Sequence, residues 1–175
     1  IIVFDFIKKA LSLQQVPPNQ IMFGLALFMT LFIMWPTFEK INNEAIQPFV
    51  NQNELPASER LSLSEFFTKL SNPIRDFMLR QTDEKYIGFF MNMRNLPAPQ
   101  TFDDVPTYIL LPAFIITELK TAFKIGFMIF IPFLVIDIVV SSILVAMGMM
   151  FLPPSIIATP FKIILFVMID GWYLI

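Results

Sequence analysis

Several side chains that commonly carry out chemistry are missing from this sequence of 175 residues. It has no cysteine and no histidine, only 5 glycines, and charged residues make up just 15% of it. Without cysteine the chain offers neither a disulfide nor a thiolate, and without histidine it lacks the commonest catalytic base and metal ligand. Soluble domains usually contain about 25% charged residues. We therefore expect a membrane-associated protein that has no metal or other cofactor and is not an enzyme.

Apolar side chains take the place of these groups. They make up 56% of the sequence and include 21 phenylalanines and 11 methionines, which both pack irregular apolar surfaces. The net charge of −2 gives no reason to expect binding to nucleic acid. Residues 1–13 have the composition of the end of an apolar helix and show no signal-peptide pattern, so we expect further residues before them.

The first of three predicted segments covers residues 1–38. Its polar stretch 14–20 separates a short helix from an apolar run that is long enough to cross a bilayer when residues 18–38 are included. Lys8 and Lys9 precede this run, which suggests that it starts on the cytoplasmic side of the membrane.

The second segment, 39–106, is polar, and we expect it to form a helical module outside the cytoplasm. Apolar residues within 61–82 follow the i, i+3, i+4, i+7 spacing of an amphipathic helix, and a second helix is expected over 84–95. Arg75 and Arg80 lie on the first of these helices. They either make ionic contacts between neighbouring subunits or are ordinary solvent-exposed charges.

Six charged residues interrupt the third segment, 107–175, which is otherwise apolar: Glu118, Lys120, Lys124, Asp137, Lys162 and Asp170. A lipid-facing charge at mid-bilayer costs at least about 2.5–3.5 kcal/mol, so these helices should face protein or water over much of their length. The first three either form an ionic contact between subunits or are ordinary charges on the surface of a helix. The last three are expected to be buried, and Lys162 could pair with either aspartate. Two isolated aspartates are weak evidence for a proton path.

The loop expected near 147–154 combines a glycine, methionines and two prolines. Gly148 permits backbone angles that other residues resist, and Pro153 and Pro154 are expected to stop a helix and stiffen the return of a hairpin. The soft apolar side chains between them are Met149, Met150 and Phe151. These side chains either fill the core of the hairpin or line a narrow passage that excludes water.

Four stretches carry a resemblance to a known family: "QQVPPNQIMFGLALFMTLFIM", "PIRDFMLRQT", "ELKTAFKIGFMIFIPFLVIDIVVSSILVAMGMMFLPP" and "PFKIILFVMIDGW". In this order, over residues 1–175, they resemble the FliP family of flagellar type III secretion, whose injectisome relatives form the SctR family. Residues 39–70 are the least distinctive part of the match.

The resemblance implies an all-α membrane protein that is a pore-forming core subunit of the export gate. Its long helical hairpins and extracytoplasmic helical module would assemble with other copies, and with FliQ-like and FliR-like subunits, into a ring-like helical cone. Unfolded flagellar proteins would pass through the cone. The implied location is the bacterial inner membrane, in the flagellar basal body, with part of the chain on the periplasmic side.

The resemblance also implies that the methionine-rich loop forms a gasket around the pore. The corresponding residues here are Met149, Met150 and Phe151, the last in place of a third methionine that many relatives carry. The alternatives are an injectisome export gate or a small-solute channel or transporter subunit, although no inverted repeat supports a transporter. An intramembrane enzyme would need a nucleophile–base pair, and the sequence contains no recognisable one.

Overall fold

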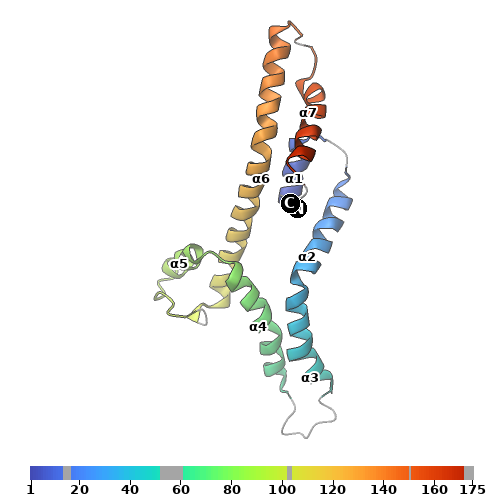
Figure 1. Cartoon of the computed structure of the whole chain (residues 1–175). Coiled ribbons are helices and arrows are strands. Elements are labelled where there is room, and N and C mark those ends of the chain that lie inside the picture. The colour runs from blue at the N-terminus through green and yellow to red at the C-terminus, as the bar shows by residue number, and fades with distance from the viewer. Residues whose placement is uncertain (14–16, 52–60, 102–103, 150, 172–175) are drawn as a thin grey trace. The chain divides into compact units, whose positions relative to one another are not determined.

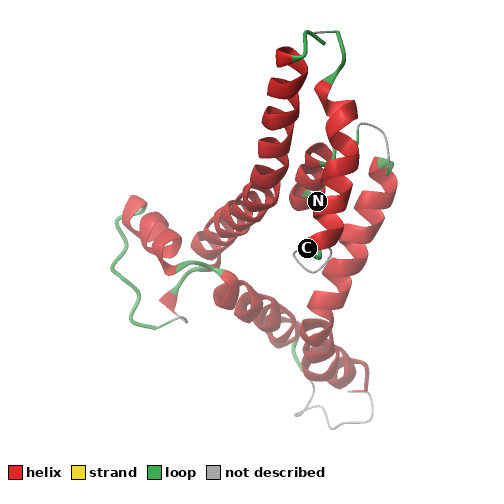
Figure 2. Ribbon diagram, turned by 45° about the horizontal axis from the view of Figure 1, so that its top comes forward, coloured by secondary structure: helices red, strands yellow, loops and turns green. Residues whose placement is uncertain are grey.

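The computed structural model describes residues 1–13, 17–51, 61–101, 104–149 and 151–171. Every regular element in these ranges is a helix, as the sequence predicts (Figures 1 and 2). The chain divides into two compact units, one of Ile1–Leu27 with Lys120–Ile175 and the other of Phe28–Leu119. The predicted segments 1–38, 39–106 and 107–175 divide the chain by its position about a membrane, and that division stays a prediction.

The helices follow one another along the chain as α1 (Ile2–Ala10), α2 (Asn19–Ile41), the π-helix η1 (Asn42–Ile46), α3 (Gln47–Val50), α4 (Leu63–Gln81), α5 (Glu84–Met93), α6 (Thr107–Ala146) and α7 (Pro154–Met168). Two helical stretches, Asn19–Val50 and Thr107–Ala146, are long and apolar enough to cross a membrane, with mean hydropathies of 1.9 and 2.7. Only 6% and 17% of their most apolar windows are buried within the chain. Most of their apolar surface is therefore available to lipid or to other subunits.

Local signals explain where α4 and α5 begin. The side chain of Ser62 accepts a hydrogen bond from the backbone N–H of Glu65, and the Glu65 carboxylate accepts one from the N–H of Ser62 at 2.8 Å. This capping box satisfies two backbone donors that the first turn of a helix leaves free. Asp83 caps α5 by accepting a hydrogen bond from the N–H of Lys85. The helices predicted over 61–82 and 84–95 thus match α4 and α5 within two residues at each end.

The core of the first unit joins α1, α6 and α7, which lie side by side in Figure 1. It consists of Ile7, Ala10, Ile129, Phe133 and Phe166. Gly126 lets α1 approach α6 closely, because a methyl group at this position would overlap the ring of Phe6. The Phe6 ring contacts three aromatic rings of α6, with centroids 5.4–6.4 Å away: Phe123, Phe127 and Phe130.

The second unit has a separate core, formed by α4, α5 and the first turns of α6. Its buried residues are Met78, Ile87, Met91, Val105, Ile109, Leu110 and Ala113. Away from this core, Phe49 of α3 packs on Phe66 of α4 with ring centroids 4.4 Å apart. The amphipathic faces predicted for α4 and α5 are thus partly covered by the chain itself.

Candidate pore loop and buried charges

The loop between α6 and α7 begins at a glycine that has a left-handed backbone conformation. Gly148 has φ of +75°, its N–H bonds to the carbonyl of Val145 at 3.0 Å, and the N–H of Met149 bonds to Leu144 at 2.9 Å. These two bonds are the Schellman arrangement that ends many helices, and glycine is favoured at its left-handed position. The expected role of Gly148 in shaping this loop therefore has a direct geometric basis.

The two prolines act differently from our expectation. We predicted that Pro153 and Pro154 stop the helix, but α6 already ends at Ala146, before either proline is reached. Pro154 is instead the first residue of α7, and the N–H of Ile156 bonds to the carbonyl of Pro153 at 3.1 Å. Proline fits the first helical position because its fixed φ suits the helix and its missing N–H would have no intrahelical partner. The prolines therefore start the return helix.

The apolar side chains of the loop are not packed inside the hairpin. Phe151 is 99% exposed and Met149 is 44% exposed, and the neighbouring Met147 and Leu152 are exposed as well. Met150, the remaining predicted gasket residue, lies outside the described residues. The loop closes the α6–α7 hairpin at one end of the first unit (Figure 1). For Phe151 the alternative of hairpin packing does not hold within this chain.

An ion pair lies inside the first unit. The Lys162 side chain of α7 is 0% exposed, and its Nζ lies 2.7 Å from Oδ2 of Asp137 on α6 and 2.8 Å from Oγ of Ser12. Lys162 therefore pairs with Asp137, which resolves the choice that the sequence left open. Oδ1 of Asp137 is buried and has no hydrogen-bond partner among the described residues. One ammonium group thus links α6, α7 and the end of α1.

Asp170 was predicted to be buried, and this prediction is wrong. The residue is exposed and has φ of +49° just after α7. The N–H groups of Asp170 and Gly171 bond back to Val167 and Phe166, so Asp170 occupies the left-handed position of a second Schellman ending. Aspartate is one of the few residues besides glycine that adopt this conformation readily.

The charged cluster on α6 lies at the surface of the chain. Glu118, Lys120 and Lys124 are all exposed on this helix, near the point where it passes from one compact unit to the other. Their exposure fits either of the two explanations considered above. An ionic contact between subunits stays a prediction for these residues.

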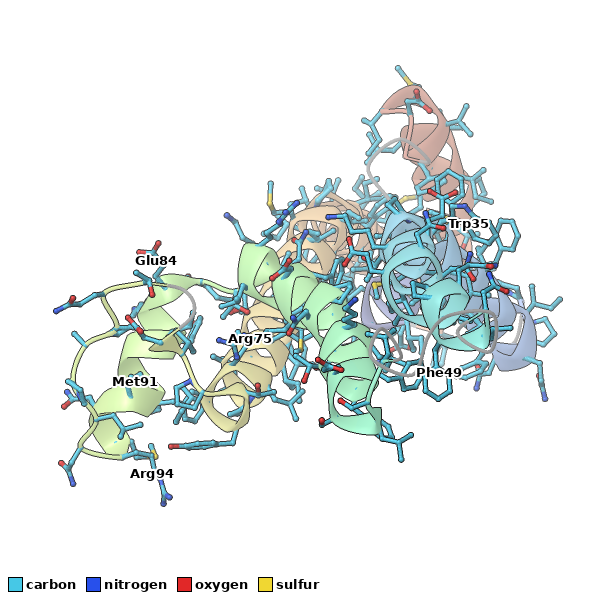
Figure 3. All side chains as sticks on the ribbon, turned by 90° about the horizontal axis from the view of Figure 1, so that it is seen from below. Trp35, Phe49, Arg75, Glu84, Met91 and Arg94 are labelled. Carbon is cyan, nitrogen blue, oxygen red and sulfur yellow. The ribbon has the colours of Figure 1, made fainter. Side chains whose placement is uncertain are left out.

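Arg75 and Arg80 lie on the same helix but have different surroundings. Arg75 donates hydrogen bonds to the carbonyl of Val105 at 2.6 Å and to Oγ1 of Thr107 at 3.1 Å, and so attaches α4 to the start of α6 (Figure 3). Arg80 is exposed. Arg75 therefore has a stabilising role within its own subunit, and contacts of either arginine with another subunit stay a prediction.

Hydrogen bonds to two exposed carboxylates organise the second unit. Asp104 Oδ2 accepts hydrogen bonds from the N–H groups of Thr101 at 2.8 Å and Gln100 at 3.1 Å. These bonds, chiefly the one from Thr101, hold the pKa of Asp104 below its ordinary value. The hydrogen bonds from Ser62 lower the pKa of Glu65 in the same way.

Two polar contacts, one in each unit, could not be predicted from the sequence. Ser12 accepts a hydrogen bond from Lys162, which is 150 residues away, and Oγ1 of Thr117 accepts one from the N–H of Asp83 at 3.1 Å. A single serine or threonine among apolar residues has no spacing that would identify its partner. Within the described ranges, no three His, Cys, Asp or Glu side chains are placed to hold a metal ion.

The described residues define a class of protein: all-helical, with two helices suited to cross a membrane and an exposed apolar loop at the end of a hairpin. A sequence profile of the FliP family matches residues 1–175. The chain therefore belongs to the FliP family, as its motifs indicate. Membership agrees with the expectation of a membrane protein that is not an enzyme.

Several relatives match almost all of the chain. The flagellar biosynthetic protein FliP of Bacillus subtilis is 51% identical over 175 residues, covering 100% of this chain and 76% of that protein. The protein of the same name from Borreliella burgdorferi is 51% identical over 177 residues, covering 99% and 67%. That of Aquifex aeolicus is 41% identical over 177 residues, covering 100% and 71%.

Proposed function

We propose that this chain is a component of the flagellar export apparatus, and specifically a pore-forming core subunit of the type III secretion export gate. The observation that carries the proposal is the loop after α6, where Phe151 is 99% exposed although it is a large aromatic side chain. Met147, Met149 and Leu152 are exposed beside it, and a cluster of exposed apolar side chains marks a contact surface. Family membership over residues 1–175 supports an export role, and the relatives named above are flagellar, which favours a flagellar over an injectisome gate.

The loop would act as a gasket when several copies surround one axis. Each copy contributes Met149, Met150 and Phe151, and the Schellman ending at Gly148 sets the direction in which the loop leaves α6. An apolar constriction excludes water and ions at rest. Methionine side chains are unbranched and flexible, so they can close on one another or yield to a passing polypeptide. Unfolded flagellar proteins are the proposed cargo.

The proposed partners are other copies of this chain together with FliQ-like and FliR-like subunits, assembled as a ring-like helical cone. Support comes from α2 and α6, whose apolar surfaces are mostly uncovered in the single chain. Lys162 and Oδ2 of Asp137 already pair inside the first unit, so the ammonium group of Lys162 does not require a counter-charge from another subunit. The proposed location is the inner membrane, in the flagellar basal body, with residues 39–106 on the periplasmic side.

Ion leakage through the assembled complex tests the gasket. We expect Met149→Ala with Met150→Ala to increase conductance across the inner membrane. Truncating these side chains in every copy opens a water-filled gap at the constriction. Phe151→Ala should add to the leak, and secretion should be partly retained because the passage is widened. Conductance is measured on reconstituted complexes carrying each set of changes.

A matched control uses exposed apolar residues on α6 away from the loop. Met128 and Ile131 are 65% and 56% exposed, so Met128→Ala with Ile131→Ala removes similar apolar atoms without touching the loop. This control should conduct as the wild type does. A loop variant that assembles normally and does not leak would show that these residues are not a gasket. Recovery of a lone monomer in mild detergent, without two smaller membrane partners, would instead favour a small-solute channel.

A further inference from the structure

A cavity of about 780 Å³ lies in the first unit. None of the residues proposed to form the gasket lines it. Residues of α1, the first turn of α2 and one side chain of α6 line it. Its apolar side chains are Ile1, Ile2, Phe6, Met22, Phe23 and Phe123. This is enough apolar surface to hold part of a hydrocarbon chain, and it adjoins the first turn of a helix that is suited to cross a membrane.

The rim of the cavity carries charge. Nζ of Lys8 donates to the carbonyl of Pro17 and to Oδ1 of Asn19, each at 3.2 Å, which holds its ammonium group at the rim. Lys9 pairs with Asp5 at 2.7 Å, and both side chains are more than half exposed. The two lysines and one aspartate leave the rim with a net positive charge.

We propose that this cavity binds one anionic phospholipid, with an acyl chain against Phe6, Phe23 and Phe123 and the phosphate beside Lys8 and Lys9. The combination of an apolar slot and a cationic rim is what selects this ligand. A free phosphate ion would use only the rim, and a zwitterionic lipid would gain less from the net positive charge. The first turn of α2 would lie at headgroup depth, where lysines near the membrane surface attract anionic lipids.

The full-length protein in its assembled complex is the material for the test. Lipid retention is measured by native mass spectrometry after exchange into detergent that contains either dioleoylphosphatidylglycerol or dioleoylphosphatidylcholine. We expect the phosphatidylglycerol to be retained in preference to the phosphatidylcholine. Lys8→Gln should weaken its retention about fivefold, the effect expected for one lysine near an anionic surface. Lys8→Arg keeps the charge and should retain the lipid.

Two further variants separate binding from a folding defect. Among the described residues that line the cavity, Asp5 is the only acid. Asp5→Asn should therefore strengthen retention of the phosphatidylglycerol, which a damaged fold would not do. Met22→Trp fills part of the slot without changing charge and should weaken retention. Lys40→Gln changes an exposed lysine in the second unit, outside the cavity, and should have no effect.

Three results would overturn the proposal. They are equal retention of the two lipids, no change in Lys8→Gln and Asp5→Asn, and displacement of the lipid by millimolar inorganic phosphate, which would leave no role for the slot. The measurement does not depend on conductance or secretion, so a failed gasket test and a failed lipid test can be told apart.

Discussion

The two compact units treat their charged groups in different ways. In the second unit, Glu65 and Asp104 bind backbone N–H groups in full contact with solvent. In the first unit, Lys162 is fully buried and pairs with Asp137 among apolar helices. Water can solvate these two carboxylates of the second unit, whereas a charge that is buried in the first unit must find a partner within the protein. A change to the buried Lys162 should therefore be costly, and changes to the exposed carboxylates Glu65 and Asp104 should be mild.

The largest effect is expected from breaking the buried pair. Lys162→Met leaves the carboxylate of Asp137 without its cation and should lower the free energy of unfolding by about 3 kcal/mol. This value is at the low end for a buried pair because the Asp137 side chain keeps 34% exposure. The free energy of unfolding is measured on the purified protein in mild detergent. Adding Asp137→Asn should restore most of the loss, since no charge then stays unpaired.

Lys124→Met is the matched control for this prediction. Lys124 is also a lysine of the first unit, but it is exposed on α6. Its replacement should change the free energy of unfolding by less than about 0.5 kcal/mol. Equal losses for the two lysine variants would mean that burial does not distinguish them and that the comparison of the two units fails.

A smaller loss is expected for Arg75→Met in the second unit. The change removes the two charged hydrogen bonds to Val105 and Thr107, and such bonds contribute about 1.5–3 kcal/mol each when buried. Arg75 is only half-buried, so we expect a total loss of about 2 kcal/mol. Hydrogen exchange should rise at the start of α6, and Arg80→Met serves as the control on the same helix. Unchanged exchange in Arg75→Met would contradict the role of this arginine in attaching α4 to α6.

The smallest effect concerns pH. Because hydrogen bonds lower the pKa of Glu65 and of Asp104 in the folded state, both carboxylates stabilise the second unit above their ordinary pKa. This contribution is lost as the pH falls through the lowered pKa values of the folded state. Hydrogen exchange at the start of α4 and at the N–H groups of Gln100 and Thr101 should increase over this acid range. Asp104→Asn and Glu65→Gln should each flatten the response in their own segment only.

Local signals made part of the fold predictable. The helices α4 and α5 follow from apolar spacing and from capping residues that lie within a few positions of one another, as with Ser62 and Glu65. A glycine just beyond a helix also predicts where the helix ends, because few other residues accept the backbone angles of Gly148. These features depend on neighbours in the sequence, so a single chain is enough to identify them.

The errors and omissions share a different cause. The partner of Lys162 depends on how α7 packs against α6 and α1, and nothing near Lys162 in the sequence specifies that packing. Asp170 was assigned to the interior because its neighbours are apolar, although its place just beyond a helix end makes it exposed. The role of Pro153 and Pro154 was misjudged because α6 already ends at Ala146, where the Schellman arrangement with Gly148 closes it. Tertiary packing decides which residue pairs with Lys162. The order along the chain of the residues that can end a helix decides which of them ends it.

The close approach of α1 to α6 has a consequence for how this sequence can change over time. Any side chain larger than hydrogen at position 126 would enter the space of the Phe6 ring, so the two positions are not free to vary independently. A lineage that gains an alanine or serine at position 126 should also carry a smaller residue at position 6. Positions 6 and 126 lie 120 residues apart in the sequence. Covariation between them among members of the family would therefore be evidence that they are in contact.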